Sequence, residues 1–183
     1  MNEKKLTYTV FKVGKEKYAL HVDFAERIVV PQYIREVPNT SKEIRGITNI
    51  DDFIVTVVDL RIKFGLKSDK IHETPYIIIS RHDKLKDVVV GFVVDEVNEV
   101  LTITPDKEGN IPINTNITGS IVGNETPYIY GVYRKEKQII KKDEKGNERE
   151  EKDYDLIIVL DAEKLLTEDM LKELADLKED SDQ

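Results

Sequence analysis

The chain has 183 residues and no cysteine. This length suits one domain or two closely packed subdomains, and the absence of cysteine excludes disulfide bonds, iron–sulfur clusters and thiol nucleophiles. Charged residues make up 35% of the chain, the formal net charge is -8 and the sequence pI is about 5.1. We expect no nucleic-acid partner, because neutralising phosphates requires clustered Lys and Arg.

The N-terminal lysines are not followed by the apolar stretch of a signal peptide. Apolar stretches such as residues 88–94 are also much shorter than the ~20 residues of a membrane helix. We therefore expect a cytoplasmic protein with no direct membrane insertion.

Short strand patterns dominate the chain. They are rich in β-branched and aromatic residues, and residues 14–17 form a turn between the first two. Pro31 disfavours a central strand over residues 28–30, because proline cannot donate to a sheet. Frequent short strands favour an all-β fold of barrels over a parallel α/β sheet. The predicted strands cover residues 7–13, 18–22, 53–58, 76–80, 88–94 and 97–103.

Short helices have recognisable starts. Asp59 and Asp161 each follow a strand and can accept hydrogen bonds from free backbone N–H groups, which predicts a structural cap at both positions. Gly65 can end the first helix in a left-handed conformation. A C-terminal amphipathic helix is predicted from about Thr167, with acidic residues in its first turn. Its apolar stripe is Met170, Leu171, Leu174 and Leu177.

The two halves of the chain resemble each other. Residues 22–28 and 94–100 share the pattern V-D-x-[AV]-x-x-[IV], and Ile-Arg-Gly at 44–46 corresponds to Ile-Thr-Gly at 117–119. The two capping aspartates are separated by more residues than the two members of each matching pair of segments. This larger separation implies an insertion in the second half. We expect two related subdomains, with tight corners at Gly46 and Gly119 where a side chain would crowd the backbone.

The predicted insertion is a charged hairpin at residues 134–155, rich in lysine before Gly146-Asn147 and in acidic residues after it. Gly-Asn is a suitable two-residue hairpin centre. The hairpin is either a solvated loop or a dedicated docking arm. The predicted cross-strand pairs are Lys145 with Glu148, Glu144 with Arg149, and Lys142 with Glu151.

Motifs for catalysis or cofactor binding are not found in the sequence. The three histidines have no metal-ligand spacing, residues 119–123 lack the Lys-Ser/Thr of a phosphate loop, and no nucleophile elbow occurs. Adjacent carboxylates such as Asp51-Asp52 are expected by chance in a chain this charged. We expect no enzyme activity, no cofactor and no metal.

Several segments resemble those of CheW-type chemotaxis coupling proteins. Residues 46–64 resemble the family pattern G-V-x-N-L-R-G-x-I-x-P-V-x-D-L-R, and residues 91–97 resemble G-x-x-V-D-x-V. Residues 158–166 resemble I-x-L-L-D-x-x-x-L-L, and residues 11–20 resemble F-x-L-G with the following Y-x-I. The resemblance spans residues 6 to about 170.

This resemblance implies a single CheW-like domain over residues 1–183, built from two SH3-like, five-stranded β-barrels around a shared core. The implied subdomains cover about residues 20–70 and 75–160, and the first strands cross over to close the second barrel. Helices are expected over residues 161–180. Members of the family are non-enzymatic adaptors that couple chemoreceptors to the chemotaxis histidine kinase. The implied partners are the kinase regulatory domain and the cytoplasmic tip of receptors, in arrays at the membrane.

The sequence departs from the family pattern where receptors are met. The usual Arg and Gly of N-L-R-G are replaced by Asp51 and Asp52, and the Glu of V-x-E-I is replaced by Arg27. In the family this Glu and Arg can pair across the receptor-facing surface, and because both signs are reversed here, we predict that Arg27 and Asp51 form a salt bridge. The alternative is two unrelated surface substitutions. Such a reversal favours a partner that presents Lys or Arg. The predicted partner-binding residues are Ala25, Arg27, Ile28, Arg45, Gly46, Asn49, Asp51, Asp52 and Gly119.

Two other readings remain open. One is a CheW-like scaffold in another motility or signalling array. The other is a ligand-binding or enzymatic β-barrel, which would need a polar pocket with a convergent acid, base or metal site.

Overall fold

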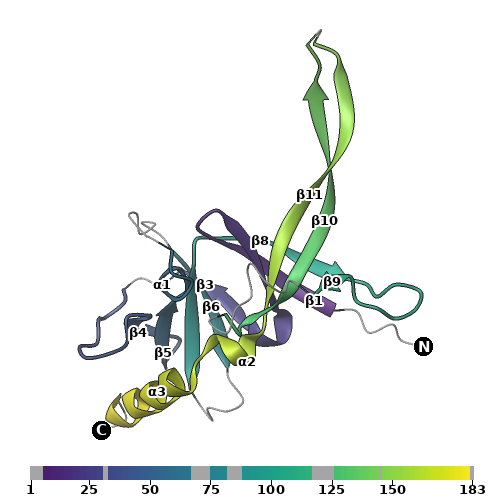
Figure 1. Cartoon of the computed structure of the whole chain (residues 1–183). Coiled ribbons are helices and arrows are strands. Elements are labelled where there is room, and N and C mark those ends of the chain that lie inside the picture. The colour runs from purple at the N-terminus through teal and green to yellow at the C-terminus, as the bar shows by residue number, and fades with distance from the viewer. Residues whose placement is uncertain are drawn as a thin grey trace.

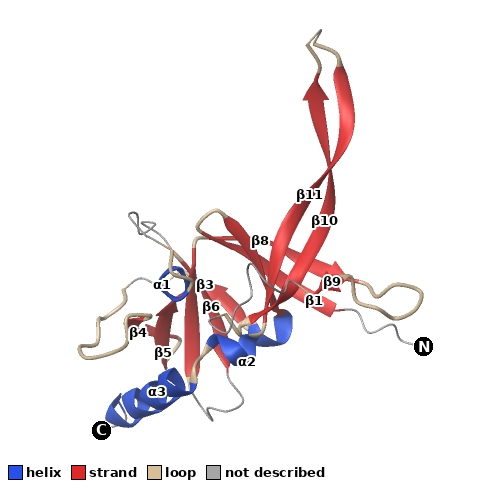
Figure 2. Cartoon of the chain, in the orientation of Figure 1, coloured by secondary structure: helices blue, strands red, loops and turns tan. Residues whose placement is uncertain are grey.

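The protein is built from two β-sheets with short helices, as a computed structural model shows (Figures 1 and 2). The structure describes residues 6–30, 33–66, 75–81, 88–116, 126–144 and 146–181, with side chains up to residue 177. The all-β class with short helices is confirmed. No helix in these ranges is both long and apolar enough to cross a bilayer.

The elements follow the predicted order closely. All six predicted strands are present, and β4 and the short strand β9 are additions that the sequence patterns did not indicate. The elements are β1 (Leu6–Val13), β2 (Glu16–His21), a 3-10 turn (Val22–Phe24), β3 (Arg27–Val29), β4 (Ile44–Ile50), β5 (Phe53–Asp59), α1 (Leu60–Lys63), β6 (Tyr76–Arg81), β7 (Val89–Val94), β8 (Glu96–Ile103), β9 (Ile113–Asn114), β10 (Ile129–Lys142), β11 (Glu148–Leu160), α2 (Ala162–Leu165) and α3 (Glu168–Ser181).

The five-stranded sheet has the order β3-β6-β7-β5-β4. Its middle strand β7 is buried along its whole length, which explains its uninterrupted apolar sequence. The short strand β3 lies at one edge, as the following Pro31 requires. Beyond β3, Arg35 forms a two-way backbone bridge with Ile47 of β4, at 2.8 Å in each direction. This bridge draws the two edges of the sheet together around a small apolar interior.

The six-stranded sheet has the order β8-β1-β2-β11-β10-β9. The N-terminal strands therefore pair with strands from the second half of the chain: β1 with β8, and β2 in parallel with β11. In contrast, β6 and β7 lie in the sheet of β3–β5. The residue boundaries of the two subdomains remain a prediction. Neither sheet forms a fully closed barrel in the described residues, and both agree with the SH3-like subdomains that the resemblance implies.

A third apolar cluster joins the two sheets. It combines side chains from β1, β2, β5 and β7 with those of α1, α2 and α3, including Phe11, Leu60 and Phe92. Met170 and Leu174 of α3 are buried in it, and Leu171 and Leu177 pack at its margin. The predicted apolar stripe of the last helix is thus confirmed, and it attaches α3 to the shared core (Figure 1).

Both predicted helix caps are present. The Asp59 carboxylate accepts the Arg61 N–H at 2.9 Å, and the Asp161 carboxylate accepts the Glu163 N–H at 3.1 Å. The two aspartates have nearly the same backbone conformation, with φ of -87° and -91°. Gly65 ends α1 with a φ of 68°, and its N–H donates to the Ile62 carbonyl.

An aromatic row runs through the shared core. The Tyr18 ring stacks on Phe64 with centroids 4.7 Å apart, and Phe64 stacks on Tyr128 at 5.3 Å. Burial raises the pKa of Tyr18 to about 12, and the neighbouring charges of Glu16 and Tyr128 act in the same direction. Burial likewise lowers the pKa of Lys63, which lies over the Tyr128 ring.

We predict that alkaline pH destabilises the fold through Tyr18. Its pKa is higher in the folded state than in the unfolded state, so its contribution is complete below about pH 10 and is lost as pH rises through about 12. By about pH 11.5 the loss is about 2 kcal/mol. Urea unfolding at pH 8 and 11.5 should show a smaller alkaline loss in Tyr18→Phe than in the wild type. Equal losses in both proteins would contradict this assignment.

The charged segment forms a hairpin that projects from the body as a two-stranded arm of β10 and β11 (Figure 1). The predicted register was wrong: Lys142 lies opposite Glu148, not Glu151, and Arg149 lies opposite Lys141, not Glu144. Lys145 is outside the described residues. The loop runs from Asp143 to Asn147, because the Asp143 carboxylate accepts the Asn147 N–H at 2.9 Å and the Gly146 N–H donates to the Asp143 carbonyl.

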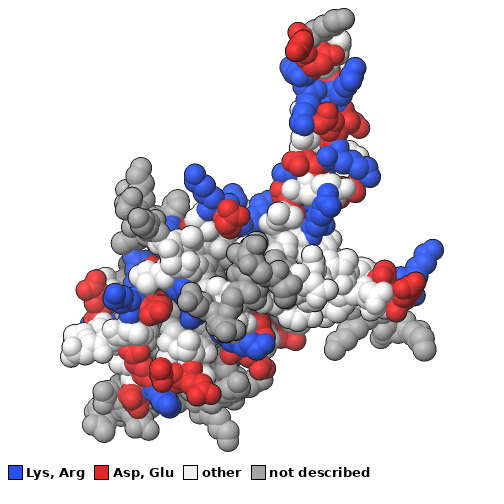
Figure 3. Space-filling model, viewed as in Figure 1, with Lys and Arg blue, Asp and Glu red and all other residues white. Residues whose placement is uncertain are grey.

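Opposite charges alternate along this arm (Figure 3). Lys141 pairs with Glu151 at 2.6 Å, and Lys152 pairs with Glu136 at 2.9 Å. At the base, the Asp155 carboxylate contacts both Lys137 and Lys17 of β2. Hydrogen bonds from these two lysines lower the pKa of Asp155 to about 2. The base of the arm is thus fixed to the body, whereas the outer part makes exposed pairs within itself.

We predict that the arm can be shortened without loss of the fold. Deleting residues 137–142 and 148–153 removes equal lengths of both strands, keeps the native loop at 143–147 and preserves the alternation of faces. The exposed ion pairs that are lost each contribute about 0–1 kcal/mol, and loops tolerate length changes. The free energy of unfolding, measured in urea, should fall by less than about 2 kcal/mol. A protein that no longer unfolds cooperatively would show that the arm belongs to the core.

Candidate functional site

The site is built on the tight turn between β4 and β5. Ile50 pairs with Phe53, so Asp51 and Asp52 are the two loop residues of the hairpin. Both have positive φ, 47° and 67°, as a type I′ turn requires. Aspartate tolerates this conformation better than most residues do. The turn therefore presents two adjacent carboxylates to solvent at the end of the five-stranded sheet.

The predicted salt bridge between Arg27 and Asp51 is confirmed. Arg27 Nη1 on the edge strand β3 donates to Asp51 Oδ2 and so joins β3 to the turn that follows the other edge strand, β4. The side chains are 46% and 72% exposed, so solvent screens much of their attraction. The bridge therefore fixes the position of the turn relative to β3 more than it stabilises the fold.

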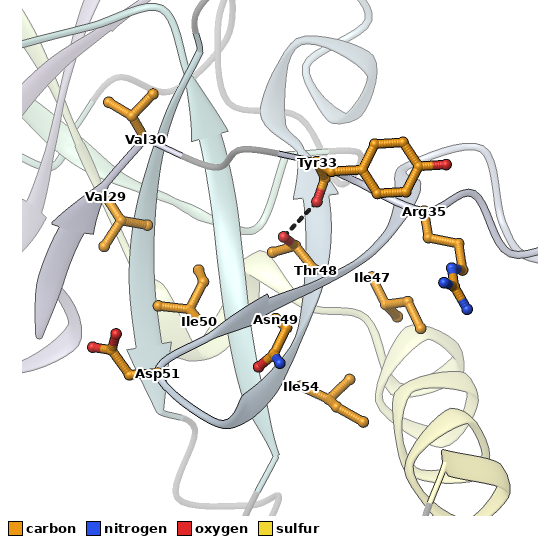
Figure 4. Close-up of a pocket in the computed structure, with 10 residues that line it drawn as sticks. All are labelled: Val29, Val30, Tyr33, Arg35, Ile47, Thr48, Asn49, Ile50, Asp51 and Ile54. Atoms are coloured by element: carbon orange, nitrogen blue, oxygen red, sulfur yellow. Dashed lines mark hydrogen bonds between the residues drawn. The ribbon is translucent and has the colours of Figure 1, made fainter.

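A hollow of about 650 Å³ lies beside this bridge (Figure 4). It is open on one side and lies between the segment after β3 and the β4–β5 hairpin. The Thr48 hydroxyl donates to the Tyr33 carbonyl at 2.6 Å and holds the two walls together. Its lining mixes apolar and polar side chains in nearly equal measure, with Asp51 and Arg35 at opposite ends: Val29, Val30, Tyr33, Arg35, Ile47, Thr48, Asn49, Ile50, Asp51 and Ile54.

A second hollow of about 240 Å³ shares Ile50 and Asp51 with the first. Its apolar lining includes the buried side chains of Val55 and Ile79. Its charged lining consists of two neutralised pairs. Besides Arg27 with Asp51, the Arg81 guanidinium donates to Glu26 at 2.8 Å. The same Arg81 lies over the exposed Phe53 ring, 5.3 Å from its centroid.

The structure brings only some of the predicted partner-binding residues together. Arg27, Asn49 and Asp51 line the hollows, Asp52 follows on the turn, and Ile28 is exposed on β3. Three others lie elsewhere or outside the described residues. Ala25 packs against the shared core, Arg45 forms a 3.9 Å ion pair with Asp59 at the far end of β4, and Gly119 is outside the described residues.

Gly46 has the crowded corner position that the sequence predicted. Its φ is 144°, and a Cβ built on it would lie 2.1 Å from the Arg35 carbonyl oxygen. No ordinary side chain fits there. Gly46 therefore shapes one wall of the larger hollow indirectly, because Arg35 and Ile47 line that hollow.

No sequence pattern indicates the exposed apolar side chains at the edge of the larger hollow. Tyr33 is 72% exposed, Val30 54% and Ile54 47%. The strand β5 is apolar at most positions, so its pattern does not distinguish the exposed Phe53 and Ile54 from the buried residues that follow. Exposed aromatic and aliphatic side chains around a hollow are typical of protein-binding surfaces.

We predict a weak coupling between Arg27 and Asp51. Each single alanine variant removes the bridge, so the double variant should lose less stability than the sum of the two single losses. The difference should be about 0.2–1 kcal/mol, because both side chains are largely exposed. Urea unfolding of the wild type and the three variants measures this coupling. Strict additivity would argue against an energetic role for the contact.

Comparisons with known proteins agree with this architecture. The model of the CheW-like domain family matches residues 7–170. The chain is 30% identical to the chemotaxis protein CheW of Thermotoga maritima over 163 residues, 89% of each chain. It is also 30% identical to CheW of Helicobacter pylori over 146 residues, 78% of this chain and 86% of the relative. The crystal structure of the scaffolding protein TtCheW from Thermoanaerobacter tengcongensis has a TM-score of 0.64 and 23% identity, and the match covers 90% of both chains. The chain belongs to the CheW-like family.

Proposed function

We propose that this protein is a non-enzymatic adaptor that couples chemoreceptors to the chemotaxis histidine kinase. The observation that carries the proposal is the family match over residues 7–170, shared with relatives named as chemotaxis proteins. The resemblance of the motifs implies two partners: the kinase regulatory domain and the cytoplasmic tip of receptors. The adaptor acts in the cytoplasm and joins receptor arrays at the membrane.

The surface at the β4–β5 turn supports an adaptor role. It combines two adjacent hollows, exposed apolar side chains and paired charges, and this combination suits contact with another protein. Among the described residues, no group of three or more His, Asp or Glu side chains is placed to hold a metal ion. An enzymatic barrel would require a convergent acid, base or metal site, and the two carboxylates in the hollows are each paired with an arginine.

Binding to purified partners tests the proposal. The full chain should bind both the regulatory domain of the chemotaxis kinase and a cytoplasmic chemoreceptor fragment from the same genome. It should also increase the amount of kinase that sediments with membranes containing the receptor. Binding to neither partner would overturn the proposal. A scaffold of another signalling array, the second candidate, would instead bind the kinase and receptor encoded beside it.

A further inference from the structure

We propose that the two hollows form one docking groove with opposite charges at its ends, and that its partner surface is polarised in the reverse sense. The partner would place apolar side chains in the hollows, a Lys or Arg beside Asp52 and an Asp or Glu beside Arg35. This inference rests on the proposed function, since it names the chemistry of the surface that the adaptor recognises.

The shape of the groove follows from the shared lining of the hollows. Ile50 and Asp51 belong to both, so the hollows are neighbours separated by the bridge from Arg27 to Asp51. Apolar side chains rise beside each of them, Tyr33 at the larger and Phe53 at the smaller. Each hollow can therefore take an anchoring side chain, and burying such anchors at the centre of an interface supplies much of its binding energy.

The charges of the groove do not cancel locally. Arg27 neutralises Asp51, and Arg81 neutralises Glu26. Among the described residues, neither Asp52 nor Arg35 forms an ion pair. Asp52 follows Asp51 on the turn, and Arg35 lies at the opposite end of the larger hollow (Figure 4). One end is thus left negative and the other positive.

This distribution of charge favours partners whose charges are opposite in sign to those at each end of the groove. Charges at the rim of an interface steer association and penalise a partner that presents the same sign. A surface with a basic residue at the Asp52 end and an acidic residue at the Arg35 end is attracted at both, and its apolar residues then meet the hollows. A partner with the reverse order is repelled at both ends.

Conservative neutralisation tests the polarity. Asp52→Asn keeps a residue that tolerates positive φ, and Arg35→Gln keeps a polar side chain without the charge. Each should weaken binding to the receptor fragment or to the kinase regulatory domain about two- to five-fold, with the effect decreasing at high salt. Asp176→Asn, on the exposed face of α3, is the matched control and should bind like the wild type.

Charge reversal identifies the contact. Asp52→Lys should weaken binding more than Asp52→Asn, and replacing one basic residue of the partner by Glu should restore it. If the wild type binds a partner but Asp52→Asn, Asp52→Lys and Arg35→Gln all bind equally well, the polarised groove is wrong and the adaptor function stands. If the wild type binds neither the kinase nor the receptor fragment, the proposed function itself fails.

Discussion

Asp95→Asn should lower the free energy of unfolding by about 3 kcal/mol or more, a large fraction of the ~5–15 kcal/mol typical of a domain. Asp95 forms an ion pair with Arg61, and the two side chains are only 6% and 9% exposed. The Asp95 carboxylate also accepts the Gly14 N–H at 2.6 Å, and its own N–H donates to the Lys12 carbonyl. Asparagine keeps the size and an acceptor oxygen but leaves the Arg61 charge buried without its counter-ion.

The location of this pair explains the size of the effect. Arg61 belongs to α1, Asp95 joins β7 to β8, and Gly14 lies in the turn between β1 and β2. The pair therefore connects the two sheets where the chain passes from one to the other. Loss of this contact should therefore weaken the packing between the two sheets and within the shared core.

A second variant separates the charge from the packing. Replacing both partners of a buried pair by neutral residues of similar volume is often close to neutral. The double variant Arg61→Met with Asp95→Asn should therefore be more stable than Asp95→Asn alone. Urea unfolding of the three proteins gives the comparison. A loss below about 1 kcal/mol in Asp95→Asn would show that the pair is well screened by solvent.

Local signals in the sequence predicted much of the fold. The β-branched runs located the six predicted strands, and the two aspartates before short helices act as caps. The reversed charges at Arg27 and Asp51 predicted a contact between residues far apart in the chain, and that contact is present. These predictions succeeded because each depends on a side chain and its immediate backbone, or on a single complementary pair.

The hairpin register was wrong because two turn signals overlap. The pattern D-x-x-G-N at residues 143–147 forms a turn from Asp143 to Gly146 with Gly146 at positive φ, and this turn overrides the Gly-Asn dipeptide. The same pattern at residues 106–110 forms the same loop, with the Asn110 N–H donating to the Asp106 carboxylate at 2.8 Å. The sequence contained this signal twice.

The groove and the buried ion pair of Arg61 with Asp95 depend on how distant elements pack together, which no local sequence pattern indicates. Tyr33 and Ile54 face one hollow only because the segment after β3 bridges to β4 through Arg35. Arg61 and Asp95 were visible as parts of two family motifs, but their pairing requires the chain to return from β7 beside α1. Contacts of this kind follow from the packing of distant elements and not from periodicity.

Gly46→Ala should be the most damaging single-methyl addition at the described glycines with positive φ. The new Cβ would lie 2.1 Å from the Arg35 carbonyl oxygen and 2.7 Å from its carbon, both backbone atoms that cannot rotate away. Relief requires the segment around Arg35 to move, which breaks the two 2.8 Å hydrogen bonds between Arg35 and Ile47. The steric clash and the conformational cost of positive φ add up, so we expect the free energy of unfolding to fall by about 3 kcal/mol or more. Gly46→Asp should be worse.

The matched control is Gly109→Ala, which isolates the steric part of this effect. Gly109 also has positive φ, 85°, but nothing lies within 4 Å of its added Cβ. Its alanine variant should lose only the conformational cost, about 1 kcal/mol. Because Arg35 and Ile47 line the larger hollow, Gly46→Ala should also weaken partner binding under conditions where it remains folded, whereas Gly109→Ala should bind normally. Equal stability of the two variants in urea would mean that the backbone around Gly46 accommodates a side chain without loss. The groove would then not depend on a glycine at this position.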